Sequence, residues 1–83
     1  MLNSFVNDIA QRMYVELNEI SLVEGNKIGC LDAHLLHMKS GTHQVSALVY
    51  LSEFDDVMKG LPCEALEIRV MSTISRLKLM LEP

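Results

Sequence analysis

The chain has 83 residues, of which 49% are hydrophobic, and its 7 basic and 11 acidic residues give a formal net charge of −4. This composition predicts one small globular domain and excludes a disordered chain. The basic residues are spread singly and no apolar run reaches the roughly 18 residues of a membrane span, so we expect neither a nucleic-acid partner nor a membrane. The N-terminal residues lack the pattern of a signal peptide, and we expect a cytoplasmic protein.

Residues 3–20 predict an amphipathic helix with Asn3 or Ser4 as its N-cap. Apolar residues recur there at spacings of three and four, which places them on one face of a helix. The residues of this face are Phe5, Val6, Ile9, Met13, Leu17 and Ile20. The following residues, 21–32, contain two glycines and are expected to form a loop.

Residues 31–61 fit two different patterns. Alternating apolar residues on both sides of Ser40, Gly41 and Thr42 predict a β-hairpin with its turn at these three residues. A helical pattern instead places seven apolar residues on one face. They are Ala47, Tyr50, Leu51, Phe54, Val57, Met58 and Leu61. The helical pattern matches more positions, so we expect a helix that begins near Ser40 and keep the hairpin as the alternative.

Two more helices are expected in the rest of the chain. Pro62, after Gly60 and Leu61, suits the first position of a short third helix. Ser72 is the expected cap of a final helix. The sequence therefore predicts an all-α fold, a small four-helix bundle that forms a single domain over residues 1–83. The alternative is an α-β-β-α fold with a central hairpin.

Four features of the sequence, in their order and spacing, resemble the acyl and peptidyl carrier proteins. Leu36 lies four residues before Ser40, and Phe54 lies fourteen residues after it and is followed by an acidic residue. The stretches "LPCEAL" and "TISRL" match the openings of the third and fourth helices in that family. Lys39 and Gly41 stand where the family has an aspartate and a leucine around the modified serine.

The resemblance implies that Ser40 carries a covalent 4′-phosphopantetheine arm at the start of the second helix, where free N–H groups stabilise a phosphate. The chain would then be a non-enzymatic carrier of acyl or aminoacyl thioesters in a fatty-acid, polyketide or nonribosomal-peptide pathway. Its implied partners are a phosphopantetheinyl transferase and an acyltransferase, ketosynthase or adenylating enzyme. The residues implied to contact these partners are Lys39, Gly41, Val45, Leu48 and Leu51.

The cysteines and histidines do not form a recognised metal motif. Cys30, His34, His37 and His43 are close in sequence, but their spacing is not one that zinc sites use, so we expect no metal. Cys30 and Cys63 are expected to be free thiols, with a single disulfide as the alternative. The alternative function is that of a small non-enzymatic interaction or regulatory protein without a prosthetic group, acting through its apolar surface.

Overall fold

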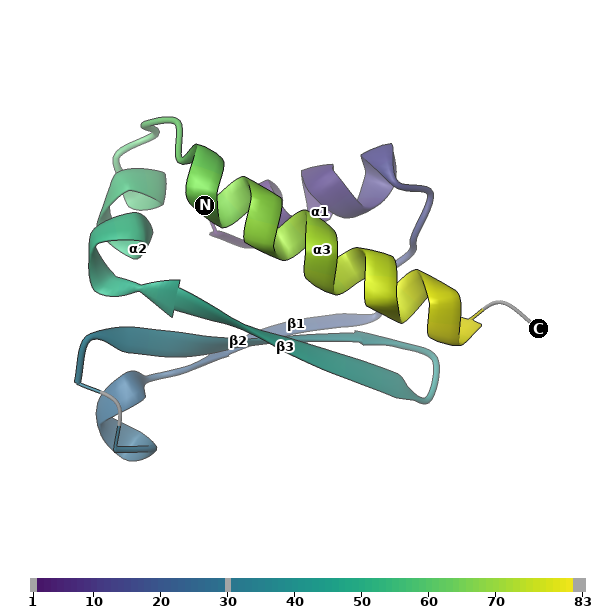
Figure 1. Cartoon of the computed structure of the whole chain (residues 1–83), viewed down its shortest axis with the longest axis horizontal. Coiled ribbons are helices and arrows are strands. Elements are labelled where there is room, and N and C mark those ends of the chain that lie inside the picture. The colour runs from purple at the N-terminus through teal and green to yellow at the C-terminus, as the bar shows by residue number, and fades with distance from the viewer. Residues whose placement is uncertain (1, 30, 82–83) are drawn as a thin grey trace.

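The computed structural model describes residues 2–29 and 31–81, which form an α+β fold. Its strands make one antiparallel sheet in the order β1-β2-β3, and two long helices lie across the same side of that sheet (Figure 1). In chain order the elements are α1 (Leu2–Arg12), β1 (Glu19–Val23), the 3₁₀ turn η1 (Gly25–Lys27), β2 (Ala33–Ser40), β3 (His43–Tyr50), α2 (Leu51–Met58) and α3 (Glu64–Leu81).

The predicted four-helix bundle is wrong. No helix begins at Ser40, because residues 33–50 form the two strands of a hairpin. The long first helix is also shorter than predicted, since α1 ends at Arg12 and β1 occupies part of the segment assigned to helix and loop. The two helices expected after Pro62 are one continuous helix, α3.

The hairpin forms because its alternation buries one side of each strand. Leu36 and Met38 of β2, with Ala47 and Val49 of β3, are all buried in the same core. Gly41, at φ +62°, takes the first central position of the two-residue turn between Ser40 and His43, where a type II′ turn requires glycine. The turn lies where the hairpin alternative placed it, but that alternative did not include β1.

The end of α1 shows why its apolar stripe is shorter than its sequence pattern. Tyr14 has a left-handed backbone, at φ 61°, and the chain turns away from the helix there. Leu17 and Ile20, which belong to the predicted helical stripe, still pack against the core, but Leu17 does so from the segment after α1 and Ile20 from β1. The spacing of apolar residues therefore identifies core contacts correctly and assigns them to the wrong element.

The core lies between the sheet and the two long helices. α1 and α3 contribute equal numbers of buried apolar residues to it, and the buried face of α3 lies against β3 and α1. The buried apolar residues outside the hairpin include Leu2, Val6, Ile9, Ala10, Val15, Val57, Leu66, Val70, Ile74 and Leu77. Thr73 is buried among them, and its hydroxyl donates a hydrogen bond to Arg69 O at 2.9 Å, so that this polar group is satisfied.

Candidate functional site

Ser40, the residue predicted to carry a prosthetic group, is the last residue of β2. Only 8% of it is exposed, and its Oγ donates a hydrogen bond to Glu16 O at 2.7 Å. Gly41 N donates to Asn18 Oδ1 at 2.5 Å. Ser40 and its neighbour thus tie the hairpin end to the segment after α1. The helix terminus that would have stabilised a phosphate at Ser40 is not present at this point of the fold.

The residues predicted to form one partner surface lie on different surfaces. Lys39 is half-buried in β2 and is paired with Glu19 and Gln44 on the strands beside it. Val45 packs against the core, whereas Leu48 is exposed on the opposite face of the sheet. Leu51 is exposed at the start of α2. A helix would have placed these side chains on one face, whereas successive residues of a strand point to opposite faces of the sheet.

β3 lies at one edge of the sheet, and side chains close the outer side of its C-terminal half. Arg69 Nη1 donates a hydrogen bond to Leu48 O at 3.1 Å, and Tyr50 N donates to Glu53 Oε1 at 3.0 Å. These backbone groups therefore point away from β2. Because backbone groups of an antiparallel strand alternate between its two sides, the N–H and C=O groups of Gln44 and Ser46 also point outward.

A charged pair holds this closure in place. Arg69 donates to both carboxylate oxygens of Glu53, at 2.6 and 3.2 Å, and its guanidinium lies 5.1 Å from the centre of the Tyr50 ring. Burial raises the pKa of Glu53, but the hydrogen bonds from Arg69 and Tyr50 N and the charge of Arg69 outweigh burial, so the pKa lies below its ordinary value. The hydrogen bonds between Arg69 and Glu53 also raise the pKa of Arg69.

The outer side of β3 at Gln44 and Ser46 differs from the rest of that edge. Within residues 2–29 and 31–81, no side chain hydrogen-bonds the outward backbone groups of these two residues. Their own side chains turn back over the sheet, because Gln44 Nε2 and Ser46 Oγ both contact His37 Nδ1, at 2.9 and 2.7 Å. The N-terminal half of the β3 edge is therefore open.

α3 runs alongside β3 in the opposite direction (Figure 1). Arg76 follows Arg69 by seven residues, which places it on the same helix face, roughly 10 Å further along the axis. About three strand residues cover the same length, so Arg76 lies level with the open half of the edge. Arg76 is exposed, and no ion pair involves it in the described part of the chain.

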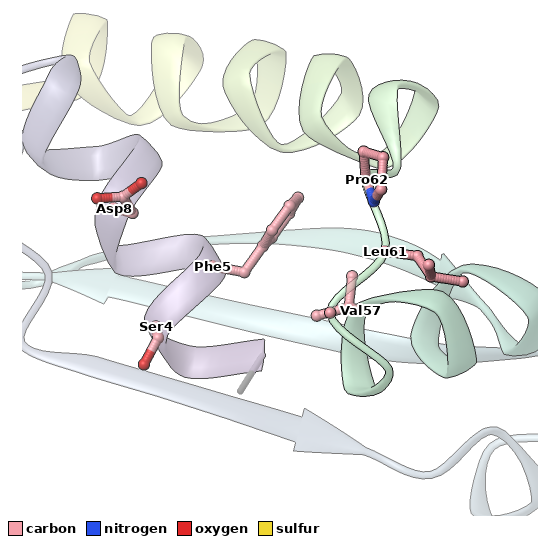
Figure 2. Close-up of a pocket in the computed structure, with 7 residues that line it drawn as sticks. Ser4, Phe5, Asp8, Val57, Leu61 and Pro62 are labelled. Atoms are coloured by element: carbon pink, nitrogen blue, oxygen red, sulfur yellow. The ribbon is translucent and has the colours of Figure 1, made fainter.

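A second surface is a groove of about 520 Å³ between α1 and the connection from α2 to α3. Its walls are mainly apolar, and Figure 2 shows Phe5 extending from α1 into the space between the two elements. Ser4 and Asp8 contribute its polar groups. The remaining lining residues are Val57, Gly60, Leu61 and Pro62. Asp8 is the only base among these residues and no hydrogen bond joins it to the Ser4 hydroxyl, so the groove favours packing over acid–base chemistry.

The described residues contain no group of three histidine, cysteine or acidic side chains placed to hold a metal ion. His34 and His37 point to opposite sides of β2: His34 packs edge-on against Phe54 and accepts a hydrogen bond from Gly25 N, while His37 faces Ser46. Cys63 is a half-buried free thiol, and Cys30 lies outside the described residues. No helix within the described ranges is long and apolar enough to cross a membrane.

Comparison of the chain with protein-family models, curated proteins and solved structures finds no match. The β3 edge is the feature that the sequence did not reveal directly. Two signals bear on it: polar residues alternate with core residues at Gln44 and Ser46, and no acidic residue occurs between residues 33 and 50.

Proposed function

We propose that this chain is a small non-enzymatic interaction module that binds an extended segment of a partner protein as a fourth strand beside β3. The observation that carries the proposal is the half-open edge: Leu48 O and Tyr50 N are capped by Arg69 and Glu53, while no side chain among the described residues caps the outward backbone groups of Gln44 and Ser46. Strand addition needs exposed backbone donors and acceptors of this kind.

The open half lacks the features that proteins commonly use to block an edge. Charged side chains, prolines and covering elements are the usual means. β3 contains no Asp, Glu, Lys, Arg or Pro from His43 to Tyr50, and the closure by Arg69 and Glu53 stops at Leu48. The other edge strand, β1, has only five residues, compared with eight in β3. Short edge strands are less able to accept another strand, so β3 is the better candidate.

The backbone alone supports a weak complex. Two outward-facing residues supply up to four hydrogen bonds, and each contributes about 0.5–1.5 kcal/mol net. Affinity beyond that must come from side chains of the bound segment against α3 and the sheet. A module of this kind is expected to bind reversibly and to select partners by the side chains that flank the shared hydrogen bonds.

The carrier function implied by the family resemblance stays a prediction. Ser40 lies at the end of a strand with its hydroxyl bonded to Glu16 O, and this geometry gives the attachment of phosphopantetheine no support. The interaction module, in contrast, uses features that the fold does possess.

Selection from random peptides tests the proposal while the partner is still unidentified. Peptides displayed on phage would be selected on the immobilised wild-type chain and then measured on two variants at one position. Ser46→Pro removes the outward N–H and blocks the edge, whereas Ser46→Ala removes only the hydroxyl and keeps the edge. We expect selected peptides to lose binding to the proline variant and to keep it on the alanine variant.

Two outcomes would contradict the proposal. One is a selection in which every binding peptide recognises Ser46→Pro as well as the wild type. The other is a selection that yields no binder. The far-ultraviolet circular dichroism of each variant shows that it is folded, so that loss of binding reports on the edge.

A further inference from the structure

We infer that the segment bound beside β3 is acidic, with a carboxylate that pairs with Arg76. This inference rests on the proposed function, because it names the chemistry of the partner at the same edge. It follows from the distribution of charge around the open half of β3 and from the position of α3 next to it.

The open half of β3, with Arg76 level with it, is a basic zone on an acidic protein. The formal net charge is −4, yet β2 and β3 contain no acidic residue and only Lys39 as a formal charge. From Val70 to Leu81, α3 contains Arg76 and Lys78 and again no acidic residue. Glu53, the carboxylate beside this edge, is bonded to Arg69 at the closed half. At the open half a negatively charged segment would therefore meet Arg76, which forms no ion pair with the described residues, whereas at the closed half the charge of Arg69 is already paired with Glu53.

The geometry places Arg76 where an added strand would meet it. Arg69, two turns earlier on the same helix face, reaches the outer side of β3 to bond Leu48 O. Arg76 repeats that position level with Gln44 and Ser46, and Met80 follows four residues later on the same face, where it is half exposed. A strand added beside β3 would place alternate side chains under this face of α3. A carboxylate followed by an apolar side chain matches Arg76 and Met80.

The same charges argue against a second copy of this chain as the occupant. Two copies pairing through β3 would bring two basic zones together, because β3 has no carboxylate to offer to Arg76 of the other copy. Like charges placed side by side oppose association. The favoured occupant is therefore a different, acidic segment.

A matched pair of peptides tests the inference. The first is a short peptide of alternating threonine and valine with one glutamate in place of the central valine; the second has glutamine there. Each is titrated into ¹⁵N-labelled protein, and binding is followed through the amide signals of Gln44 and Ser46. We expect the glutamate peptide to bind about two- to five-fold more tightly, because an exposed ion pair contributes only a small free energy. Added salt should remove the difference.

Two variants test whether Arg76 causes the preference for the glutamate peptide. Arg76→Gln should make the affinities for the glutamate and glutamine peptides equal. Lys78→Gln changes the net charge equally, but Lys78 lies on the opposite side of α3, 6.0 Å from the Tyr14 ring, so this variant should keep the preference. Loss of the preference in both variants, or in neither, would overturn the assignment to Arg76.

The remaining outcomes separate the two proposals. If both peptides shift the signals of Gln44 and Ser46 with equal affinity, the acidic partner is wrong and the module remains. If neither peptide shifts them, the proposed function itself fails, and the inference fails with it. If these signals instead move with protein concentration in the absence of peptide, the occupant is a second copy and the inference is overturned.

Discussion

The two halves of the β3 edge belong to one strand and differ in how their outward backbone groups are satisfied. Leu48 O is bonded to Arg69 of α3 and Tyr50 N to Glu53 of α2, while the outward groups of Gln44 and Ser46 are bonded to no side chain of the described residues. The closed half is blocked by the charged pair of Arg69 and Glu53, which come from two different helices. Side chains of this fold therefore block the outward backbone groups over only part of the β3 edge.

The two halves are also expected to serve different purposes, the closed half stability and the open half binding. The closed half contains buried or half-buried groups that depend on one another, so changes there are expected to destabilise the fold. The open half contributes few contacts to the folded chain beyond its pairing with β2. Positions where a general rule of folding is broken without a structural gain are often the ones that function requires.

The largest expected effect tests which residues of β3 have backbone N–H and C=O groups that point away from β2. The backbone N–H and C=O of Ala47 point towards β2, where the residue is paired with Leu36. Ala47→Pro therefore removes an inter-strand hydrogen bond, leaves its acceptor unsatisfied and should lower the free energy of unfolding by about 2–4 kcal/mol. Ser46→Pro, one residue earlier, removes an N–H that points outward, and should cost at most about 1 kcal/mol. Urea denaturation followed by circular dichroism measures both. Equal losses would mean that Ser46 is not turned outward, and the open edge would not exist.

The second effect is the loss of the closure itself. Glu53→Ala removes the carboxylate that bonds Arg69 and Tyr50 N, and leaves the half-buried Arg69 guanidinium without its charged partner. We expect the free energy of unfolding to fall by about 2–3 kcal/mol. Gln44→Ala, the control in the open half, should change it by no more than about 0.5 kcal/mol. If the Glu53 variant were as stable as this control, the two halves would be energetically equivalent.

The sequence contains signals for the hairpin, but its apolar spacing favours a helix in the same segment. Residues 45–51 fit both a period of two and a period near 3.6, and counting matched positions favoured the longer helical pattern. The decisive local signal was the turn: Gly41 has the residue type that a two-residue hairpin turn requires, and Val45 and Val49 are β-branched residues, which suit strands. Weighing turn chemistry above the number of matches would have selected the strands.

The closed and open halves of the edge could not be predicted in this way. Glu53 and Arg69 are sixteen residues apart in sequence, and their contact exists only because α3 returns alongside β3. The sequence does not predict β1 for a similar reason, since Leu17 and Ile20 fit a helical spacing while they reach the core from outside α1. Such contacts depend on the topology of the whole chain, which single-sequence patterns do not encode.

The smallest expected effect is a pH dependence confined to the closed half. The pKa of Glu53 lies below its ordinary value of 4.5 in the folded chain, because the hydrogen bonds from Arg69 and Tyr50 N outweigh the effect of burial. The unfolded chain therefore takes up a proton at a higher pH than the folded chain does. The stability that Glu53 provides is complete well above pH 4.5 and is lost as the pH falls through the lower, folded value.

Other carboxylates titrate in the same range, so the comparison must be made with Glu53→Gln, which keeps the shape of the side chain and removes its charge. Urea denaturation at a series of pH values should show that the wild type loses more stability on acidification than this variant, and that the two curves approach one another at the acidic end. The affinity of the open half for the neutral, glutamine-containing peptide should not follow this difference, because neither Gln44 nor Ser46 contacts Glu53. Parallel stability curves for the two proteins would show that the charge of Glu53 does not hold the edge closed, and the distinction between the halves would then rest on geometry alone.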